Sequence, residues 1–187
     1  MNMVLERIHA NPIIAALKNA DDLEDVIKSQ VNVVFVLHAD IFNIDYLVNA
    51  IKDSGKSVLI HIDFLEGIGR DNKAIDYIAQ RIKPDGIIST RSNHIKYAKE
   101  NGMFAIQRFF LIDSLSYDTL IKSVHSLPPD MVEILPGAMP SVLAKITAQL
   151  EMPVIAGGLI SSKEDIIMLL NSGVQGVSTG KKELWML

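Results

Sequence analysis

The feature that most constrains the fold of this chain is a regular alternation of short apolar runs with longer amphipathic segments. Eight such runs recur along the sequence. Most are continuous rather than interrupted by polar residues, as expected of strands buried on both faces of a parallel sheet. We therefore predict strands at Ile13–Leu17, Val33–Leu37, Val58–Ile62, Gly86–Ser89, Phe104–Phe110, Met131–Leu135, Val154–Ala156 and Gly176–Ser178.

The segments between these runs have helical spacing and carry helix boundary signals. Glycine or proline follows most of them, and acidic or hydroxyl residues open several. We predict helices after Asp21 and Asp22, then at Ile41–Ser54, Asn72–Ile82, Ser92–Glu100, Ser114–Val124, Pro140–Leu150 and Ser162–Asn171, with a short last one at Lys181–Leu187.

Eight strand–helix units with short connections predict right-handed parallel crossovers and a closed (β/α)₈ TIM-type barrel. Such barrels usually have about 250 residues, so a chain of 187 residues must have short loops. A flavodoxin-like open sheet is the alternative. No linker or shift of composition divides the chain, and we expect residues 1–187 to form a single α/β barrel domain.

The composition excludes several classes of function. Cysteine is absent, which excludes disulfides, thiolate zinc sites and a cysteine nucleophile. The net charge is −4, so any contact with nucleic acid requires a local basic patch. The N-terminus lacks the features of a signal peptide, and no apolar run approaches the roughly 18 residues of a membrane span. We expect a cytoplasmic protein with no membrane partner.

Motifs for cofactors, metals and covalent catalysis are also missing. The sequence contains no P-loop, Rossmann fingerprint, His-Glu-x-x-His motif or nucleophile elbow, and its histidines lack the paired spacing of a metal site. An aldolase on this scaffold needs a desolvated strand lysine, and Lys18 alone follows a predicted strand. We therefore predict no cofactor, no metal and no catalytic residues.

Two glycine-containing turns near the C-terminus predict a phosphate site. Pro153–Asp165 and Gly176–Gly180 both read as a buried strand that ends in glycine and hydroxyl residues before a helix. The loops after strands seven and eight commonly bind phosphate in this fold, because glycines let the backbone approach an anion and helix N-termini present free N–H groups. The alternative is structural: a sharp strand exit followed by an ordinary capping box.

Polar residues within or after the strands predict the rest of a ligand site. Asp63 lies two residues beyond His61, so an extended strand would point both to the same side. Glu133 and Gln107 interrupt apolar strands, and we expect both to face the barrel mouth, because an unpaired buried carboxylate is unstable.

Structural roles remain open for these residues. Asp63 could instead cap a loop or pair with Arg91 or Arg108, and His61 could be an ordinary core histidine. Residues 81–108 hold six Lys or Arg against two Asp or Glu, which could face phosphates or form a solvated helix surface.

Several motifs, in order along nearly the whole chain, resemble the glycerol uptake operon antiterminator family. They are Pro12–Ala16, His61–Gly67, Pro84–Ser92, Ala105–Phe109, Val132–Gly137, Pro153–Gly158 and Val177–Trp185. The resemblance implies a trimmed barrel, related to former enzymes, that senses glycerol 3-phosphate. It also implies transcription regulation by antitermination: the loaded protein acts on the leader mRNA of a glycerol-catabolism operon and promotes read-through of a terminator.

The resemblance also implies roles for particular residues. The phosphate would lie on Gly157, Gly158, Ser178, Thr179 and Gly180, and the glycerol hydroxyls would face Asp63, Gln107, Arg108 and Glu133. Arg91, Lys96 and Lys99 are candidates for RNA or ligand contact. Gly180 departs from the family pattern, because many relatives have a second serine at this position. The glycine lacks the hydroxyl donor but keeps the backbone N–H. The region around Phe35–Ile44 matches weakly.

Three functions remain open at this point. The first is the ligand-gated RNA-binding regulator, with a homodimer as a further candidate assembly. The second is an isomerase or lyase acting on a small phosphorylated metabolite, suggested by Asp63 and Glu133 near a phosphate site. The third is a phosphate-binding barrel that serves only as an assembly module.

Overall fold

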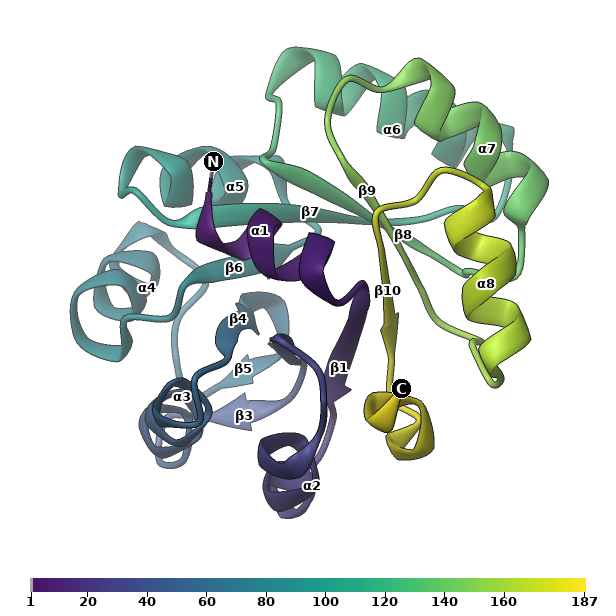
Figure 1. Cartoon of the computed structure of the whole chain (residues 1–187). Helices are drawn as coiled ribbons and strands as arrows, with labels where there is room; N and C mark the ends of the chain where they lie inside the picture. The colour runs from purple at the N-terminus through teal and green to yellow at the C-terminus, as the bar shows by residue number, and fades with distance from the viewer. Residues whose placement is uncertain (1) are drawn as a thin grey trace.

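The barrel is closed and entirely parallel in the computed structural model, which describes residues 2–187. Its eight strands pair in the order β1-β10-β9-β8-β7-β6-β4-β2, and β2 returns to β1 (Figure 1). This confirms the predicted (β/α)₈ class and excludes the open sheet. The strands are β1 Ile13–Leu17, β2 Val33–Val36, β4 Ser57–His61, β6 Gly86–Ser89, β7 Phe104–Phe110, β8 Met131–Leu135, β9 Val154–Gly157 and β10 Gly176–Thr179.

Helices surround the barrel at the places that periodicity predicts. They are α2 Leu23–Lys28, α3 Ile44–Asp53, α4 Asn72–Tyr77, α5 Ser92–Glu100, α6 Ser114–Ser126, α7 Pro140–Gln149 and α8 Lys163–Asn171, with a short 3₁₀ helix at Lys182–Met186. The predicted helix at Asn72–Ile82 is α4 followed by a π-helix at Ile78–Ile82, and α6 ends two residues later than predicted. The largest difference at a helix start is at α3, which begins three residues later than predicted. Asp40 accepts hydrogen bonds from the N–H groups of Phe42 and Asn43, which forms a turn before the helix.

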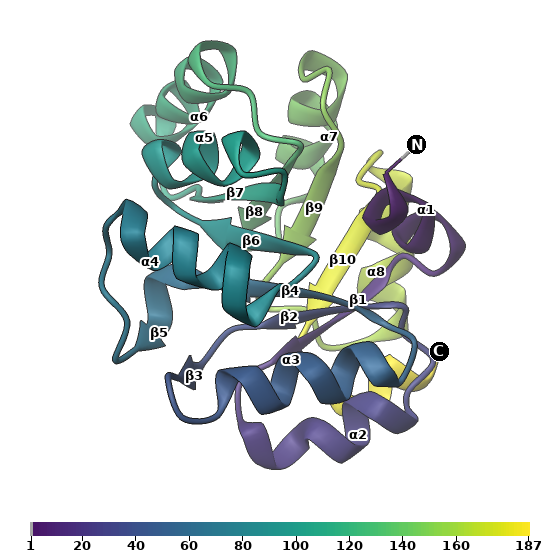
Figure 2. The ribbon, with the colours of Figure 1, turned by 90° about the vertical axis from the view of Figure 1, so that its left-hand side faces the viewer.

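Two elements were not predicted. The helix α1 (Met3–Ala10) precedes the first strand and lies across one end of the barrel (Figure 1). A two-stranded parallel sheet joins β3 (Ala39–Asp40) to β5 (Leu65–Glu66), beyond the C-terminal ends of β2 and β4 (Figure 2). The strands β3 and β5 have two residues each, too few to leave a periodic signal, and α1 lies before the first strand, outside the repeated strand–helix units.

Two apolar layers hold the fold together. One lies between the strands and the outer helices, and the other fills the barrel interior. Val4 and Ile8 of α1 belong to the interior cluster with Phe35 and Ile106, so the N-terminal end of the barrel is sealed by apolar packing. The C-terminal end is therefore the end that is open to a ligand, as in other barrels of this class. No helix among residues 2–187 is long and apolar enough to cross a membrane.

Candidate functional site

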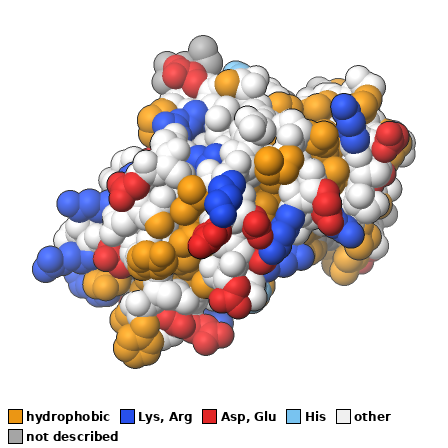
Figure 3. Space-filling view, turned by 60° about the horizontal axis from the view of Figure 1, so that its bottom comes forward, with side chains coloured by type: hydrophobic (Ala, Val, Ile, Leu, Met, Phe, Trp, Pro, Cys, Tyr) orange, Lys and Arg blue, Asp and Glu red, His pale blue; other side chains and the backbone are white. Residues whose placement is uncertain are grey.

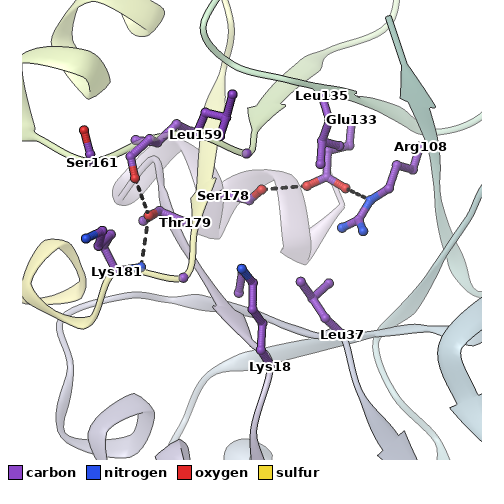
Figure 4. A pocket seen from close by; sticks show the side chains of 14 residues that line it. Lys18, Leu37, Arg108, Glu133, Leu135, Leu159, Ser161, Ser178, Thr179 and Lys181 are labelled. Atoms are coloured by element: carbon purple, nitrogen blue, oxygen red, sulfur yellow. Dashed lines mark hydrogen bonds and ion pairs between the residues drawn. The ribbon is translucent and has the colours of Figure 1, made fainter. Parts of the chain in front are cut away.

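A cavity of about 560 Å³ opens at the C-terminal ends of the strands, between β1 and β2 on one side and β7 to β10 on the other (Figure 4). Three cationic side chains and one carboxylate lie among the residues that line it. The lining residues are Ala16, Lys18, Leu37, Arg108, Glu133, Leu135, Gly158, Leu159, Ile160, Ser161, Ser178, Thr179, Gly180 and Lys181. An excess of positive charge over a concave, partly polar surface suits a small anion.

The floor of the cavity is a hydrogen-bonded triad built around Glu133. Arg108 Nε donates to Glu133 Oε2 at 2.6 Å, and Ser178 Oγ donates to Glu133 Oε1 at 2.6 Å (Figure 4). Arg108 and Glu133 lie directly opposite each other in the register of β7 and β8. The carboxylate is fully buried, and its charge is compensated by the guanidinium. As predicted, Glu133 faces the barrel mouth.

Gly157 explains how this triad spans three strands. It lies on β9 between Glu133 and Ser178, and a Cβ at this position would be 2.5 Å from Ser178 Oγ and 2.8 Å from Glu133 Oε1. Any side chain would therefore separate the two hydrogen-bonded groups. Gly157 is not among the residues lining the cavity, so its contribution to the site is to leave space for the triad.

Arg108 has donors left for a ligand. Its Nε is used by Glu133, while its two terminal nitrogens donate to no other residue within 2–187 and point toward the cavity (Figure 4). A guanidinium can hold an oxyanion or a hydroxyl with these remaining N–H groups.

The turn after β9 has an unusual backbone. Gly158 and Leu159 both have positive φ, 77° and 59°, and the second value is rare for a bulky residue. The backbone N–H groups of Gly158, Leu159 and Gly180 donate to no other residue in the described chain. These three amides are available to an anion, whereas those of Ser161 and Ser162 are taken by Asp165 Oδ2 at 2.9 and 3.0 Å. The predicted capping box at α8 is confirmed.

The hydroxyls of this region are largely engaged in internal contacts. Thr179 Oγ1 accepts from Lys181 N at 3.1 Å and donates to the Ile160 carbonyl at 3.4 Å. The Ser178 hydroxyl donates to the Glu133 carboxylate. An anion here would therefore be held mainly by backbone amides and cations.

Lys18 and Lys181 supply two of the cations. The sequence places Lys18 after the first strand and Lys181 beside the glycine turns, but it assigns neither of them a ligand contact. Lys18 follows β1 and Lys181 follows β10, so closure of the barrel brings them to the same side of the cavity. A Cβ at Gly180 would lie only 3.3 Å from Lys18 Cε, so glycine leaves room for this side chain. Their position after the first and last strands is a usable signal once a closed barrel is predicted.

Asp63 does not reach the cavity, and the expectation that it continues the strand beyond His61 is wrong. β4 ends at His61, and Asp63 lies in a 3₁₀ turn. Its carboxylate accepts from Ser89 Oγ at 2.8 Å, Thr90 N at 2.7 Å and Thr90 Oγ1 at 2.8 Å, which is the loop-capping alternative. Burial acts to raise the pKa of Asp63, but these hydrogen bonds outweigh it and lower that pKa.

Gln107 also lies outside the cavity, contrary to the prediction that it faces the barrel mouth. Its Nε2 donates to Ser92 Oγ at 2.9 Å and Ser123 Oγ at 3.1 Å, on helices α5 and α6. The pleat alternates along β7, so Arg108 points inward and Gln107 points to the helical layer. Gln107 ties the barrel to its helices.

The basic segment does not form one surface. Arg108 lies inside the barrel mouth, while Lys96 and Lys99 are on α5 and pair with Glu100 at 3.9 Å and Asp130 at 3.1 Å. Arg91 is exposed at the opposite end of α5 from Lys99. On the face shown in Figure 3, acidic side chains lie between most of the basic ones. The solvated-helix alternative therefore describes Lys96 and Lys99 better.

His61 is the remaining polar residue of the barrel interior. It is 1% exposed, and neither ring nitrogen has a hydrogen-bond partner among the described residues. Burial, reinforced by the charge of Arg108, lowers its pKa to about 4, so the ring is neutral at physiological pH. Within residues 2–187 no group of three His, Cys, Asp or Glu could hold a metal ion.

Known proteins are similar to this chain over nearly its whole length. Residues 13–185 match the family described as glycerol-3-phosphate responsive antiterminator. The uncharacterized protein YgcP of Escherichia coli (strain K12) is 39% identical over 184 residues, which cover 98% of this chain and 96% of that protein.

Two solved structures are similar in sequence as well as in fold. The glycerol uptake operon antiterminator regulatory protein of Listeria monocytogenes is 39% identical, with a TM-score of 0.90 over 94% of this chain and 95% of the other. A glycerol uptake operon antiterminator-related protein of Thermotoga maritima is 36% identical, with a TM-score of 0.83 over 94% and 98%. The resemblance inferred from the motifs is thereby confirmed, and the chain belongs to the glycerol-3-phosphate responsive antiterminator family.

Proposed function

We propose that this protein is a cytoplasmic sensor of glycerol 3-phosphate that, when loaded, binds the leader mRNA of a glycerol-catabolism operon and promotes read-through of a terminator. The observation that carries the proposal is the cationic cavity at the barrel mouth, in a member of a family defined by its response to this ligand.

The phosphate group suits the side of the cavity between β9 and β1. There the residues with free amides, Gly158, Leu159 and Gly180, line the cavity together with Lys18 and Lys181. Backbone amides at a glycine turn and nearby cations are the usual partners of a phosphate in proteins. The glycerol end would then extend toward Arg108 and Glu133.

The triad supports a binding role more than a catalytic one. Both oxygens of Glu133 already accept short hydrogen bonds, so the carboxylate is poorly placed to take a proton from a substrate. Lys18 is exposed, whereas a Schiff-base lysine is desolvated. We therefore propose that the protein is not an enzyme. The alternative is an isomerase or lyase, which the gel-shift and turnover experiment below distinguishes from a regulator.

Ligand binding can act on RNA only through a difference between two protein states. The cavity is bordered by the loops after β1, β2, β9 and β10, and a ligand that binds one arrangement of these loops more tightly shifts the population toward it. We propose that the arrangement favoured by glycerol 3-phosphate is the RNA-binding one, with the whole chain acting as one barrel unit.

Calorimetry with glycerol 3-phosphate, glycerol and inorganic phosphate tests the first half of this proposal. We expect glycerol 3-phosphate to bind most tightly, because it alone can occupy both ends of the cavity. Lys18→Met should weaken the two phosphate ligands, and Lys163→Met, an exposed lysine at the start of α8, is the matched control. Equal binding of glycerol and glycerol 3-phosphate would contradict the phosphate assignment.

A gel shift with leader RNA, with and without glycerol 3-phosphate at low and moderate salt, tests the second half. We expect the ligand to increase RNA retention. Tight ligand binding with no effect on RNA affinity would contradict the proposed regulatory function. Turnover of triose, pentose or glycerol phosphates would support the isomerase or lyase hypothesis instead. Mass measurement in the same buffers, with and without ligand and RNA, tests for the homodimer.

A further inference from the structure

A buried histidine without hydrogen bonds lies next to the cavity. His61 is the last residue of β4, and it shares its pleat with Leu59, a member of the interior cluster, so its ring also points into the barrel. A neutral imidazole carries one N–H donor and one acceptor nitrogen. Leaving both unsatisfied in a buried position is unfavourable, so a hydrogen-bonding partner that enters from outside would stabilise this ring.

The cavity reaches the strand next to His61. The register of β2 and β4 pairs Val36 with Ile60. Extended by one residue, it sets Leu37 opposite His61, and Leu37 lines the cavity. Arg108, which also lines the cavity, is close enough for its charge to lower the pKa of His61.

A partly exposed aromatic side chain packs against His61. The ring centroid of Phe64 is 4.6 Å from that of His61 and 5.3 Å from that of His38. Phe64 is itself 46% exposed, so it has room to move outward. It follows Asp63, whose three hydrogen bonds to Ser89 and Thr90 hold the start of the loop in place, so a rotation of Phe64 need not disturb the barrel.

We propose that His61 is the hydroxyl-binding residue of the ligand site and that Phe64 is the gate that covers it. This inference rests on the proposed glycerol 3-phosphate site. A hydroxyl group can accept from the imidazole N–H and donate to a neighbouring acceptor, or donate to the bare nitrogen, so it suits a neutral ring. A phosphate there would meet a neutral ring, and Arg108, the cation near His61, already pairs with Glu133. The ligand is therefore oriented with its phosphate at the β9–β10 turns and its hydroxyls toward β4.

The test compares glycerol 3-phosphate with propyl phosphate, which has the same phosphate and carbon chain but no hydroxyls. Calorimetry is carried out on the full chain, on His61→Phe and on His61→Gln, with the exposed His125→Gln as the matched control. We expect His61→Phe to weaken glycerol 3-phosphate about tenfold, the equivalent of one hydrogen bond, and to leave propyl phosphate within about twofold. His61→Gln, which keeps a donor and an acceptor, should recover part of the loss.

A second measurement needs no variant at His61. The imidazole ¹⁵N resonances of His61 in the unmodified protein should shift on addition of glycerol 3-phosphate and stay in place with propyl phosphate. For the gate, Phe64→Ala should increase the association rate of glycerol 3-phosphate severalfold, because no opening step precedes binding.

The outcomes separate this inference from the proposed function. If the unmodified protein binds neither phosphate ligand, both proposals fall. If it binds both, and His61→Phe affects neither or weakens both equally, the hydroxyl assignment is overturned while the phosphate site stands. An unchanged association rate in Phe64→Ala overturns the gate alone.

Discussion

Replacing Glu133 by glutamine tests whether the triad is held together by its charge. The substitution keeps the size of the side chain and removes the negative charge that two donors share. Arg108 Nε can only donate, so the amide oxygen must turn toward it. The amide NH₂ then faces Ser178, whose hydroxyl must rotate to accept. The geometry survives. The Ser178 bond becomes a neutral one, while Arg108 keeps its charge but loses its anionic partner.

The expected loss of stability follows from these two bonds. The Ser178 bond falls from the about 1.5–3 kcal/mol of a hydrogen bond to a charged group to the about 0.5–1.5 kcal/mol of a neutral one. The loss of the anion beside Arg108 adds to this, so the variant should lose about 2–3 kcal/mol in total. Breaking a fully enclosed ion pair costs about 3–5 kcal/mol. We expect a smaller loss here, because the terminal nitrogens of Arg108 reach the cavity and can be solvated there. For a chain of this size the melting temperature should fall by about 4–12 °C.

Urea unfolding followed by circular dichroism measures the change, with Glu151→Gln on the surface as the control. Ser178→Ala removes only one of the two bonds and should be less destabilising than Glu133→Gln. A free energy of unfolding within about 0.5 kcal/mol of the unmodified protein would refute the reasoning, because it would mean that the carboxylate charge is not compensated within the triad.

Four further predictions concern other parts of the site. Gly157→Ala places a Cβ 2.5 Å from Ser178 Oγ, so the variant should unfold at lower urea concentration and bind glycerol 3-phosphate more weakly, as calorimetry would show. Lys18→Met should lower the affinity for inorganic phosphate while leaving the melting temperature within about 2 °C. Gln107→Leu should destabilise the fold through its lost bonds to α5 and α6 without changing ligand affinity; a change in affinity would return Gln107 to the site. For His61, the pKa is about 4 in the folded protein and about 6.5 when unfolded, so the unfolded chain binds more protons between these values. Stability should thus fall by up to about 3 kcal/mol as the pH drops from 6.5 to 4, and this part of the loss should be missing in His61→Phe.

The fold could be predicted from the sequence because its signals are local. Continuous apolar runs mark strands that are covered on both faces, and the helices between them have their own periodicity and caps, as the capping box at Ser162 and Asp165 shows. These patterns involve residues a few positions apart, and eight repeats of the same unit leave few topologies to choose from. The two-residue strands β3 and β5 could not be predicted because they are too brief to show a period, and α1 lies outside the repeated units.

Side-chain direction could not be predicted in the same way. β7 is apolar along most of its length, so no alternation of polar and apolar residues shows which of two adjacent positions faces inward. From the sequence, both Gln107 and Arg108 are expected at the barrel mouth, but adjacent residues of a strand point to opposite faces, so only one of them can face inward. Asp63 was misplaced for a related reason: the strand ends at His61, and beyond that point the period of two no longer applies.

What the sequence determined by itself is the barrel, the family and the glycine turns on which an anion could rest. What only the tertiary structure decided is which groups meet there. Barrel closure brings Lys18 beside Gly180, and strand register joins Arg108 and Ser178 to Glu133 across the bare backbone of Gly157. These contacts join residues far apart in the chain, and their existence depends on strand register, on pleat and on the absence of a single Cβ, none of which is expressed in the local pattern of residues.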